Sequence, residues 1–83
     1  MIEYTLDRGI NLLRLDEVRG EEAEDTVAAL LAAERGLDLV SLSCDGVGEQ
    51  GWETWCLTLG ESDGRGGYTY SRDDTVYFMV RTI

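Results

Sequence analysis

The first eighteen residues carry the alternating pattern of a β-hairpin. In residues 2–6, apolar side chains fall on one side and polar side chains on the other, with the period of two expected of a half-buried strand. Asp7, Arg8 and Gly9 suit a tight turn whose last residue needs a positive φ. Residues 10–18 indicate a second strand, and a slip of phase inside it indicates a bulge or burial on both faces.

Residues 21–35 have the one clear helical periodicity in the chain. An apolar stripe at helical spacing is formed by Ala23, Val27, Leu30 and Leu31, while Glu22, Asp25, Ala29 and Ala32 lie mostly off it. Acidic residues crowd the first turns and Arg35 lies in the last turn, as the helix dipole favours. Gly36 fits the left-handed position that ends a helix, from which Leu37 packs back onto the last turn.

Three further segments have the alternation of strands, and they are residues 38–44, 52–59 and 75–82. A glycine-rich connection, residues 45–51, joins the first two of these strands. A long polar loop, residues 60–74, joins the last two, and residues 68–70 within it suit a short extended piece.

Alternation divides the side chains of these strands into two faces. One face of each strand carries, in chain order, Val40, Leu42 and Cys44, then Trp55, Leu57 and Leu59, and finally Val76, Phe78 and Val80. The opposite faces carry Leu39, then Trp52, Thr54, Cys56 and Thr58, and finally Tyr77, Met79 and Arg81. Trp52 and Trp55 thus lie on opposite faces, so one belongs to the core, and the other is a surface anchor or a cover for the sheet.

The order of elements is strand, strand, helix, strand, strand, strand. A lone helix has one apolar stripe to bury, so the simplest arrangement packs it across one face of the sheet. We therefore expect an α+β fold in a single domain, residues 1–83, with one helix on a mainly antiparallel sheet of four to five strands. The alternation leaves open which sheet face the helix covers. The open face would carry a mixture such as Trp52, Thr54, Thr58, Tyr77, Met79 and Arg81.

The charge balance narrows the choice of partners. The chain has 83 residues, of which 17 are Asp or Glu and 7 are basic, for a net charge of −10, and every basic residue is arginine. This balance argues against direct contact with nucleic acid or with anionic membranes, because both need clustered cations. It favours a basic protein surface as partner, although the same charge could serve solubility alone.

The residues offer little for catalysis. The chain contains no histidine, the usual general base, so we expect no enzyme, metal or cofactor. Cys44 and Cys56 fall in expected strands, where cysteine is most often a small buried hydrophobe, although a cross-strand disulfide remains an alternative. The start of the chain lacks the layout of a signal peptide and no apolar run is long enough to span a bilayer, so we expect a cytosolic protein.

Two regions are candidates for partner contact. The acidic region at and before the helix start comprises Asp16, Glu17, Glu21, Glu22, Glu24 and Asp25. The second region is the polar loop, with Arg65, Tyr68 and Tyr70, because Tyr and Arg are favoured interface anchors. A flexible hairpin loop without a contact role is the alternative for this second region.

In general character the chain resembles the small phage-encoded inhibitors of bacterial defence, above all the anti-CRISPR proteins. The resemblance lies in a short acidic domain, one amphipathic helix at residues 21–35, a few-stranded sheet and no catalytic motif, and no residue-level motif accompanies it. It implies inhibition of a CRISPR effector complex in the bacterial host cytosol, in some members by DNA mimicry in a basic channel. An assembly or adaptor protein that self-associates, or docks on a larger subunit, through its open sheet face is the alternative.

Overall fold

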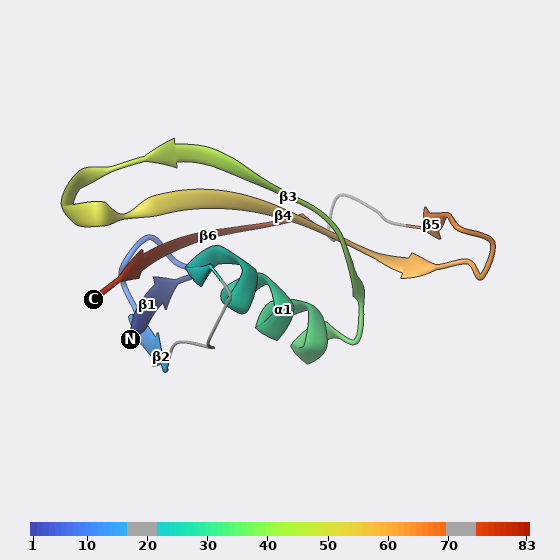
Figure 1. The fold of residues 1–83 in the computed structure, drawn as a ribbon, viewed down its shortest axis with the longest axis horizontal. Coiled ribbons are helices and arrows are strands. Elements are labelled where there is room, and N and C mark those ends of the chain that lie inside the picture. Colours follow the sequence, from blue (N-terminus) through green and yellow to red (C-terminus); the bar gives the residue numbers. More distant parts are fainter. Residues whose placement is uncertain (17–21, 70–74) are drawn as a thin grey trace.

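The computed structural model describes residues 1–16, 22–69 and 75–83. Its elements are β1 (Ile2–Thr5), β2 (Leu13–Leu15), α1 (Ala23–Arg35), β3 (Asp38–Val47), the short 3-10 turn η1 (Glu49–Gly51), β4 (Glu53–Ser62), β5 (Tyr68–Thr69) and β6 (Thr75–Thr82) (Figure 1). The expected order of strands and helix is confirmed. The last strand has the expected bounds, and β3 and β4 each extend three residues beyond their expected ends.

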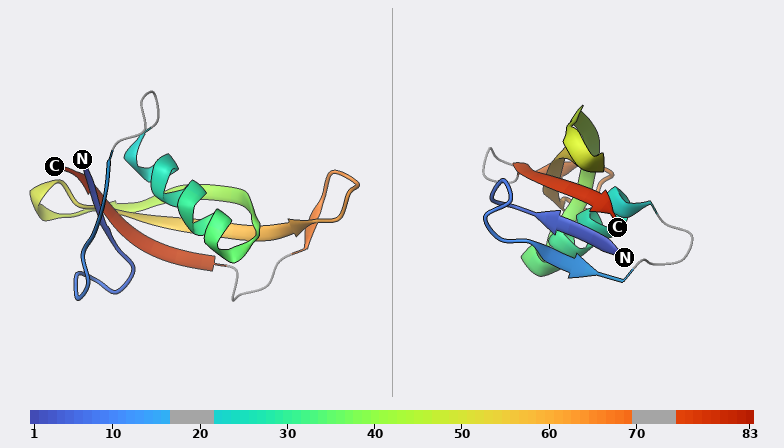
Figure 2. Two further views of the ribbon diagram at one scale, coloured as in Figure 1. Left: turned by 90° about the horizontal axis from the view of Figure 1, so that it is seen from below. Right: turned by 90° about the vertical axis from the view of Figure 1, so that its left-hand side faces the viewer.

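One antiparallel sheet forms the frame of the molecule. Five strands follow the order β2-β1-β6-β4-β3, and β5 pairs with the far end of β4. The helix α1 lies across one face of this sheet, and no helix among the described residues covers the opposite face (Figure 2). The expected α+β fold, one helix packed on a mainly antiparallel sheet, is therefore confirmed.

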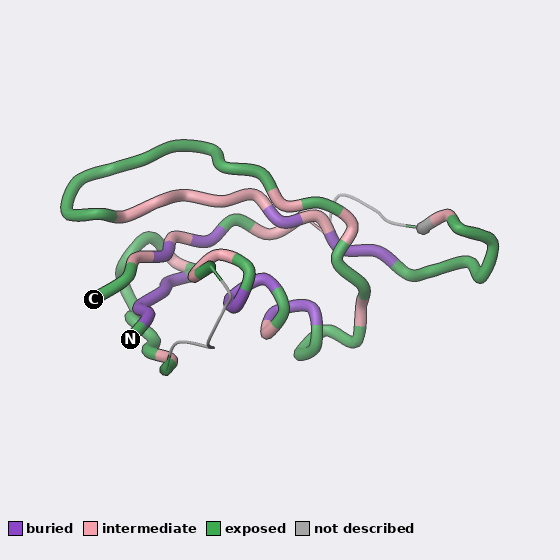
Figure 3. Tube along the Cα trace, viewed as in Figure 1, coloured by how far each residue is buried: buried purple, intermediate pink, exposed green. Residues whose placement is uncertain are grey.

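The hydrophobic core lies between α1 and the sheet face turned towards it (Figure 3). The sheet supplies Ile2, Tyr4, Leu57, Leu59, Phe78 and Val80, and the helix supplies Val27, Ala28, Leu31 and Ala32, all buried. Trp55 and Val76 pack against the margin of this cluster. The helix thus covers the face of Leu57 and Phe78, which settles the choice that the alternation left open.

The buried stripe of α1 differs slightly from the expected one. Ala32, expected off the stripe, is buried, whereas Leu30 is only half-buried. Ala28 and Ala32 are buried together with Val27 and Leu31, so small side chains form part of the helix face that meets the sheet. Gly36 ends the helix at φ 65°, and its N–H donates to the Ala33 carbonyl at 3.2 Å. The Leu37 N–H donates to the Ala32 carbonyl at 3.1 Å, which completes the expected glycine cap.

The N-terminal hairpin is present, but its expected tight turn is wrong. β2 spans only Leu13–Leu15, and residues 6–12 form the connection. Side chains hold this loop: Asp7 Oδ1 accepts the Asn11 backbone N–H at 2.8 Å, and Thr5 Oγ1 accepts the Gly9 N–H at 3.0 Å. These bonds satisfy backbone N–H groups that would otherwise donate to a neighbouring strand. The loop therefore replaces the early part of the expected strand.

Two bulges change the faces of β3. The ladder with β4 skips Val40 and Asp45, each of which is one extra residue on β3. The first bulge places Leu39 on the same face as Leu42 and Cys44, because all three pair with helix-facing residues of β4. The expected placement of Leu39 on the opposite face was therefore wrong, since simple alternation does not include an inserted residue.

Candidate functional site

The acidic region at the helix start is exposed. Glu22 occupies the position before the first helical turn, and Glu24 and Asp25 lie within that turn. Glu22 and Asp25 are exposed, Glu24 is half-buried, and Asp16 is exposed just after β2. None of these four carboxylates forms an ion pair with another described residue. The other two members of the predicted region, Glu17 and Glu21, lie outside the described residues.

The polar loop is a hairpin with a closed turn. Asp63 Oδ1 accepts the backbone N–H groups of Arg65 at 2.7 Å and of Gly67 at 3.1 Å, so the turn is tied to its own first residue. Arg65 is exposed at this turn. Tyr68 begins β5, where an extended piece was expected, and its pairing with β4 was not foreseen; Tyr70 lies outside the described residues.

The two predicted contact regions lie apart in the molecule. The helix begins near the N-terminal hairpin, whereas the β4–β5 hairpin projects at the opposite end of the long axis (Figures 1 and 2). That axis measures 41 Å. The structure therefore presents the acidic region and the Arg65 turn as two separate surfaces.

A charge network around one buried carboxylate, which the sequence analysis missed, organises part of the open sheet face. Glu3 is 1% exposed although it lies on the face without a helix. Its Oε1 accepts Arg81 Nη2 at 2.7 Å and Nε at 3.0 Å, and its Oε2 accepts Arg14 Nε at 3.2 Å. These hydrogen bonds, chiefly those from Arg81, hold the pKa of Glu3 below its usual value, against the opposing effect of burial.

Trp52 completes this network. The Arg81 guanidinium lies over the Trp52 ring, 4.6 Å from its centroid, so the cation is held between a carboxylate and an aromatic face. Trp52 is therefore the tryptophan of the open face, and Trp55 belongs to the core side. Glu3 lies directly opposite both Arg14 and Arg81 in the sheet, a placement that follows from the strand order β2-β1-β6 and could not be detected in the sequence alone.

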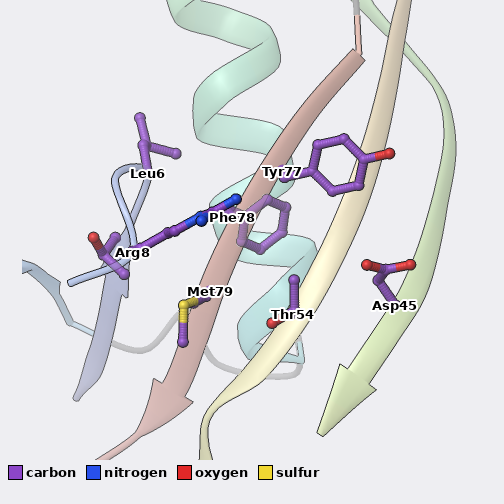
Figure 4. Close-up of a pocket in the computed structure, with 8 residues that line it drawn as sticks. Leu6, Arg8, Asp45, Thr54, Tyr77, Phe78 and Met79 are labelled. Carbon is purple, nitrogen blue, oxygen red and sulfur yellow. The ribbon is translucent and has the colours of Figure 1, made fainter. Parts of the chain in front are cut away.

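Beside this network the open face is hollowed (Figure 4). The hollow has a volume of about 660 Å³ and is lined by Thr5, Leu6, Arg8, Asp45, Thr54, Tyr77, Phe78 and Met79. Tyr77 is 56% exposed. Arg8 comes from the β1–β2 loop and Asp45 from the second bulge of β3, so the two charges border the hollow on opposite sides. Arg8 and Asp45 were missed because both were assigned to connections.

The two cysteines carry free thiols on opposite sheet faces. Cys44 pairs in register with Trp55, and Cys56 pairs with Ser43, so the alternative of a cross-strand disulfide does not fit this sheet. Cys44 is exposed, which corrects its expected burial, and Cys56 is half-buried. The Cys56 thiol raises the pKa of the neighbouring Tyr77 hydroxyl, and the charge of Asp45 acts in the same direction.

In residues 1–16, 22–69 and 75–83, no three His, Cys, Asp or Glu side chains gather in a way that could hold a metal ion. No helix formed by those residues has the length and apolar character needed to cross a membrane. No family model matches the chain, and the comparisons with curated proteins and with solved structures found no match either.

Proposed function

We propose that this protein acts by binding, as an inhibitor that covers a basic surface of a nucleic-acid-handling complex. A CRISPR effector is the target that the resemblance to anti-CRISPR proteins favours. The supporting observation is that Glu22 and Asp25 at the helix start are exposed and Glu24 is only half-buried. Glu22, Glu24 and Asp25 have no ion-pair partner among the described residues, so their charge remains available to a partner.

The placement of the arginines strengthens this proposal. Arg14 and Arg81 are both bound to Glu3, on the sheet face that α1 does not cover. They therefore do not neutralise the carboxylates of α1. A basic channel attracts polyphosphate, and a folded acidic surface enters the same field, with an association rate that salt lowers.

The dimensions of the helix suit such a channel. The 13 residues of α1 span about 20 Å at ~1.5 Å per residue. Phosphates recur about every 3.4 Å along one strand of a duplex. The acids at the helix start therefore correspond to a short run of phosphates at that end alone, because Arg35 lies beside Glu34 at the other end. Imitation of DNA is the form of inhibition we propose.

The test is inhibition of target-DNA binding by purified CRISPR effector complexes of several types, measured by mobility shift. We expect the wild-type protein to block at least one complex, and added salt to weaken the block. The triple variant Glu22→Gln, Glu24→Gln and Asp25→Asn should lose it. The matched control, Asp38→Asn, Glu49→Gln and Glu61→Gln, removes the same charge at exposed positions outside α1. Retained inhibition by the first variant would reject the acidic contact, and inhibition of no complex would reject the target class.

A second candidate function is assembly or docking on a larger subunit through the open sheet face. The hollow beside Tyr77 favours it, because an exposed aromatic side chain at a concave site is a common contact feature. Salt distinguishes the two candidates. Capture by a cluster of carboxylates weakens steeply as salt rises, whereas contact around Tyr77, with Arg8 and Asp45 as the charges that line the hollow, weakens less.

A further inference from the structure

The hollow on the open sheet face has an apolar centre between opposite charges (Figure 4). Tyr77 and Met79 line it from β6, and Thr54 lines it from β4, between the Arg8 loop and Asp45. Arg8 approaches from the side of the β1–β2 loop, and Asp45 stands on the side of β3, the far strand of the sheet. A partner for this surface must therefore offer a carboxylate at one end, a cation at the other and an apolar part between them.

The charge arrangement excludes the simplest kinds of partner. A uniformly basic surface would meet Arg8 with like charge, and a uniformly acidic surface would meet Asp45 with like charge. A second copy of the same surface meets both requirements. A two-fold axis through the apolar centre places Arg8 of each copy against Asp45 of the other and brings the two Tyr77 rings together.

We propose that two copies of this protein pair through their open sheet faces, with Arg8–Asp45 ion pairs on either side of a contact between the Tyr77 and Met79 side chains. The β1–β2 loop that borders the hollow adds apolar surface, with Leu6 43% exposed. The carboxylates of α1 lie on the other side of the sheet, so the dimer leaves them free to bind a target.

The β1–β2 loop holds Arg8 in a defined conformation. Arg8 has φ 60°, which is rare for a residue other than glycine, and it is followed by Gly9 at φ 94°. The loop is tied to Asp7 by Asn11, whose side-chain amide donates to Asp7 Oδ2 at 2.6 Å, and Thr5 Oγ1 donates to Asp7 Oδ1 at 2.8 Å. This network orders the loop around Arg8, so forming the interface requires little further ordering of its backbone.

Charge reversal with mixing tests the proposal by sedimentation equilibrium. Wild-type protein should dimerise, and Arg8→Asp or Asp45→Arg should each raise the dissociation constant about tenfold or more, because each places like charges together at both pairs. An equimolar mixture of the two variants should form a heterodimer, in which every pair is again of opposite charge. The double variant R8D/D45R should dimerise like the wild type. Asp adopts positive φ more readily than most residues, so R8D is expected to fold.

Matched controls separate this pairing from general charge effects. Arg65→Asp and Glu34→Arg make the same two charge changes at exposed positions away from the hollow, and both should leave the dissociation constant within about twofold of wild type. Circular dichroism checks that every variant is folded. Wild-type protein that stays monomeric at ~500 μM, well above a typical dissociation constant for a specific interface, would overturn the proposal. Single variants that dimerise as tightly as wild type, or a mixture that does not associate, would also overturn it.

Discussion

The two faces of the sheet bury their residues by different means, and β1 shows both. Ile2 and Tyr4 point into the core beneath α1, whereas Glu3 and Thr5 point to the opposite face, and all four are buried. On the first side the cover is a helix. On the second side the cover for Glu3 consists of side chains, namely two arginines, one of which lies over Trp52. A buried residue of β1 is therefore not always a core residue. It belongs to the hydrophobic core only where the groups that cover it are apolar.

The difference has an energetic consequence. Apolar burial stabilises a fold in proportion to area, with little demand on direction. Ion pairs to a buried carboxylate have to recover the cost of removing its charge from water, so we expect them to contribute less to stability than apolar burial does. We expect the helix-facing side to determine whether the chain folds. The open side should determine how it presents Arg8, Trp52 and Tyr77.

The sharpest test of this contrast uses two neighbours in sequence. Phe78 is 1% exposed in the core, and Tyr77 is 56% exposed on the open face. Phe78→Ala should lower the free energy of unfolding by about 3–5 kcal/mol, because it removes a large buried side chain and leaves a cavity. Tyr77→Ala should change it by less than ~1 kcal/mol. Urea unfolding followed by circular dichroism, at a concentration where the protein is monomeric, measures both.

A milder substitution at Phe78 keeps the first test informative if Phe78→Ala does not fold. Phe78→Leu keeps most of the buried volume and should cost about 1–2 kcal/mol. Comparable losses for Phe78→Ala and Tyr77→Ala would show that the open face is packed as tightly as the core, which would contradict the contrast between the two faces.

The pH dependence of the free energy of unfolding tests the open face of the sheet. We expect a smaller change in this free energy than Phe78→Ala produces. The pKa of Glu3 lies below its usual value of 4.5. Such a group stabilises the fold above its unfolded pKa and loses this contribution as the pH falls through its folded pKa. Glu3→Gln should therefore lower stability near neutral pH and flatten the loss of stability below pH 4.5. Urea midpoints at neutral pH and at about pH 3 measure the difference.

Two comparisons control the pH experiment. Glu61→Gln makes the same chemical change at an exposed position and should keep the wild-type slope. Asp7 also has a lowered pKa, chiefly because it accepts the Asn11 backbone N–H, so some acid dependence should remain in Glu3→Gln. If stability falls as steeply with pH in Glu3→Gln as in wild type, the buried ion pairs do not stabilise the fold.

Local patterns predicted most of the fold, because they act over a few residues. Gly36 ends the helix as expected, and the alternation from Thr75 to Thr82 gives a strand with those bounds. The errors arose where a side chain or an inserted residue replaced the regular pattern. Asp7 holds a loop where a strand was expected, and the bulge at Val40 moves Leu39 to the other face.

The candidate site was less accessible to sequence reasoning. The acids at the helix start could be located, because a helix dipole and a run of carboxylates are local features. The network around Glu3 needs three strands side by side in the order β2-β1-β6. The hollow needs the β1–β2 loop, which carries Arg8, and the β3 bulge, which carries Asp45, and these lie at opposite ends of the strand order. Only the strand order, which the sequence left open, brings these groups together.

The smallest expected effect tests whether the two faces are independent. Arg81 lies 4.6 Å from the Trp52 ring centroid, and such a contact is worth about 0.5–1 kcal/mol. A double-mutant cycle with Trp52→Leu and Arg81→Met should return a coupling of that size in the free energy of unfolding. The same cycle with Trp55→Leu in place of Trp52→Leu should return additive effects, because Trp55 lies on the core side. Additive effects at Trp52 would mean that the stack does not stabilise the fold, and coupling at Trp55 would mean that Arg81 acts through the sheet as a whole. The stack over Trp52 would then be no separate feature of the open face.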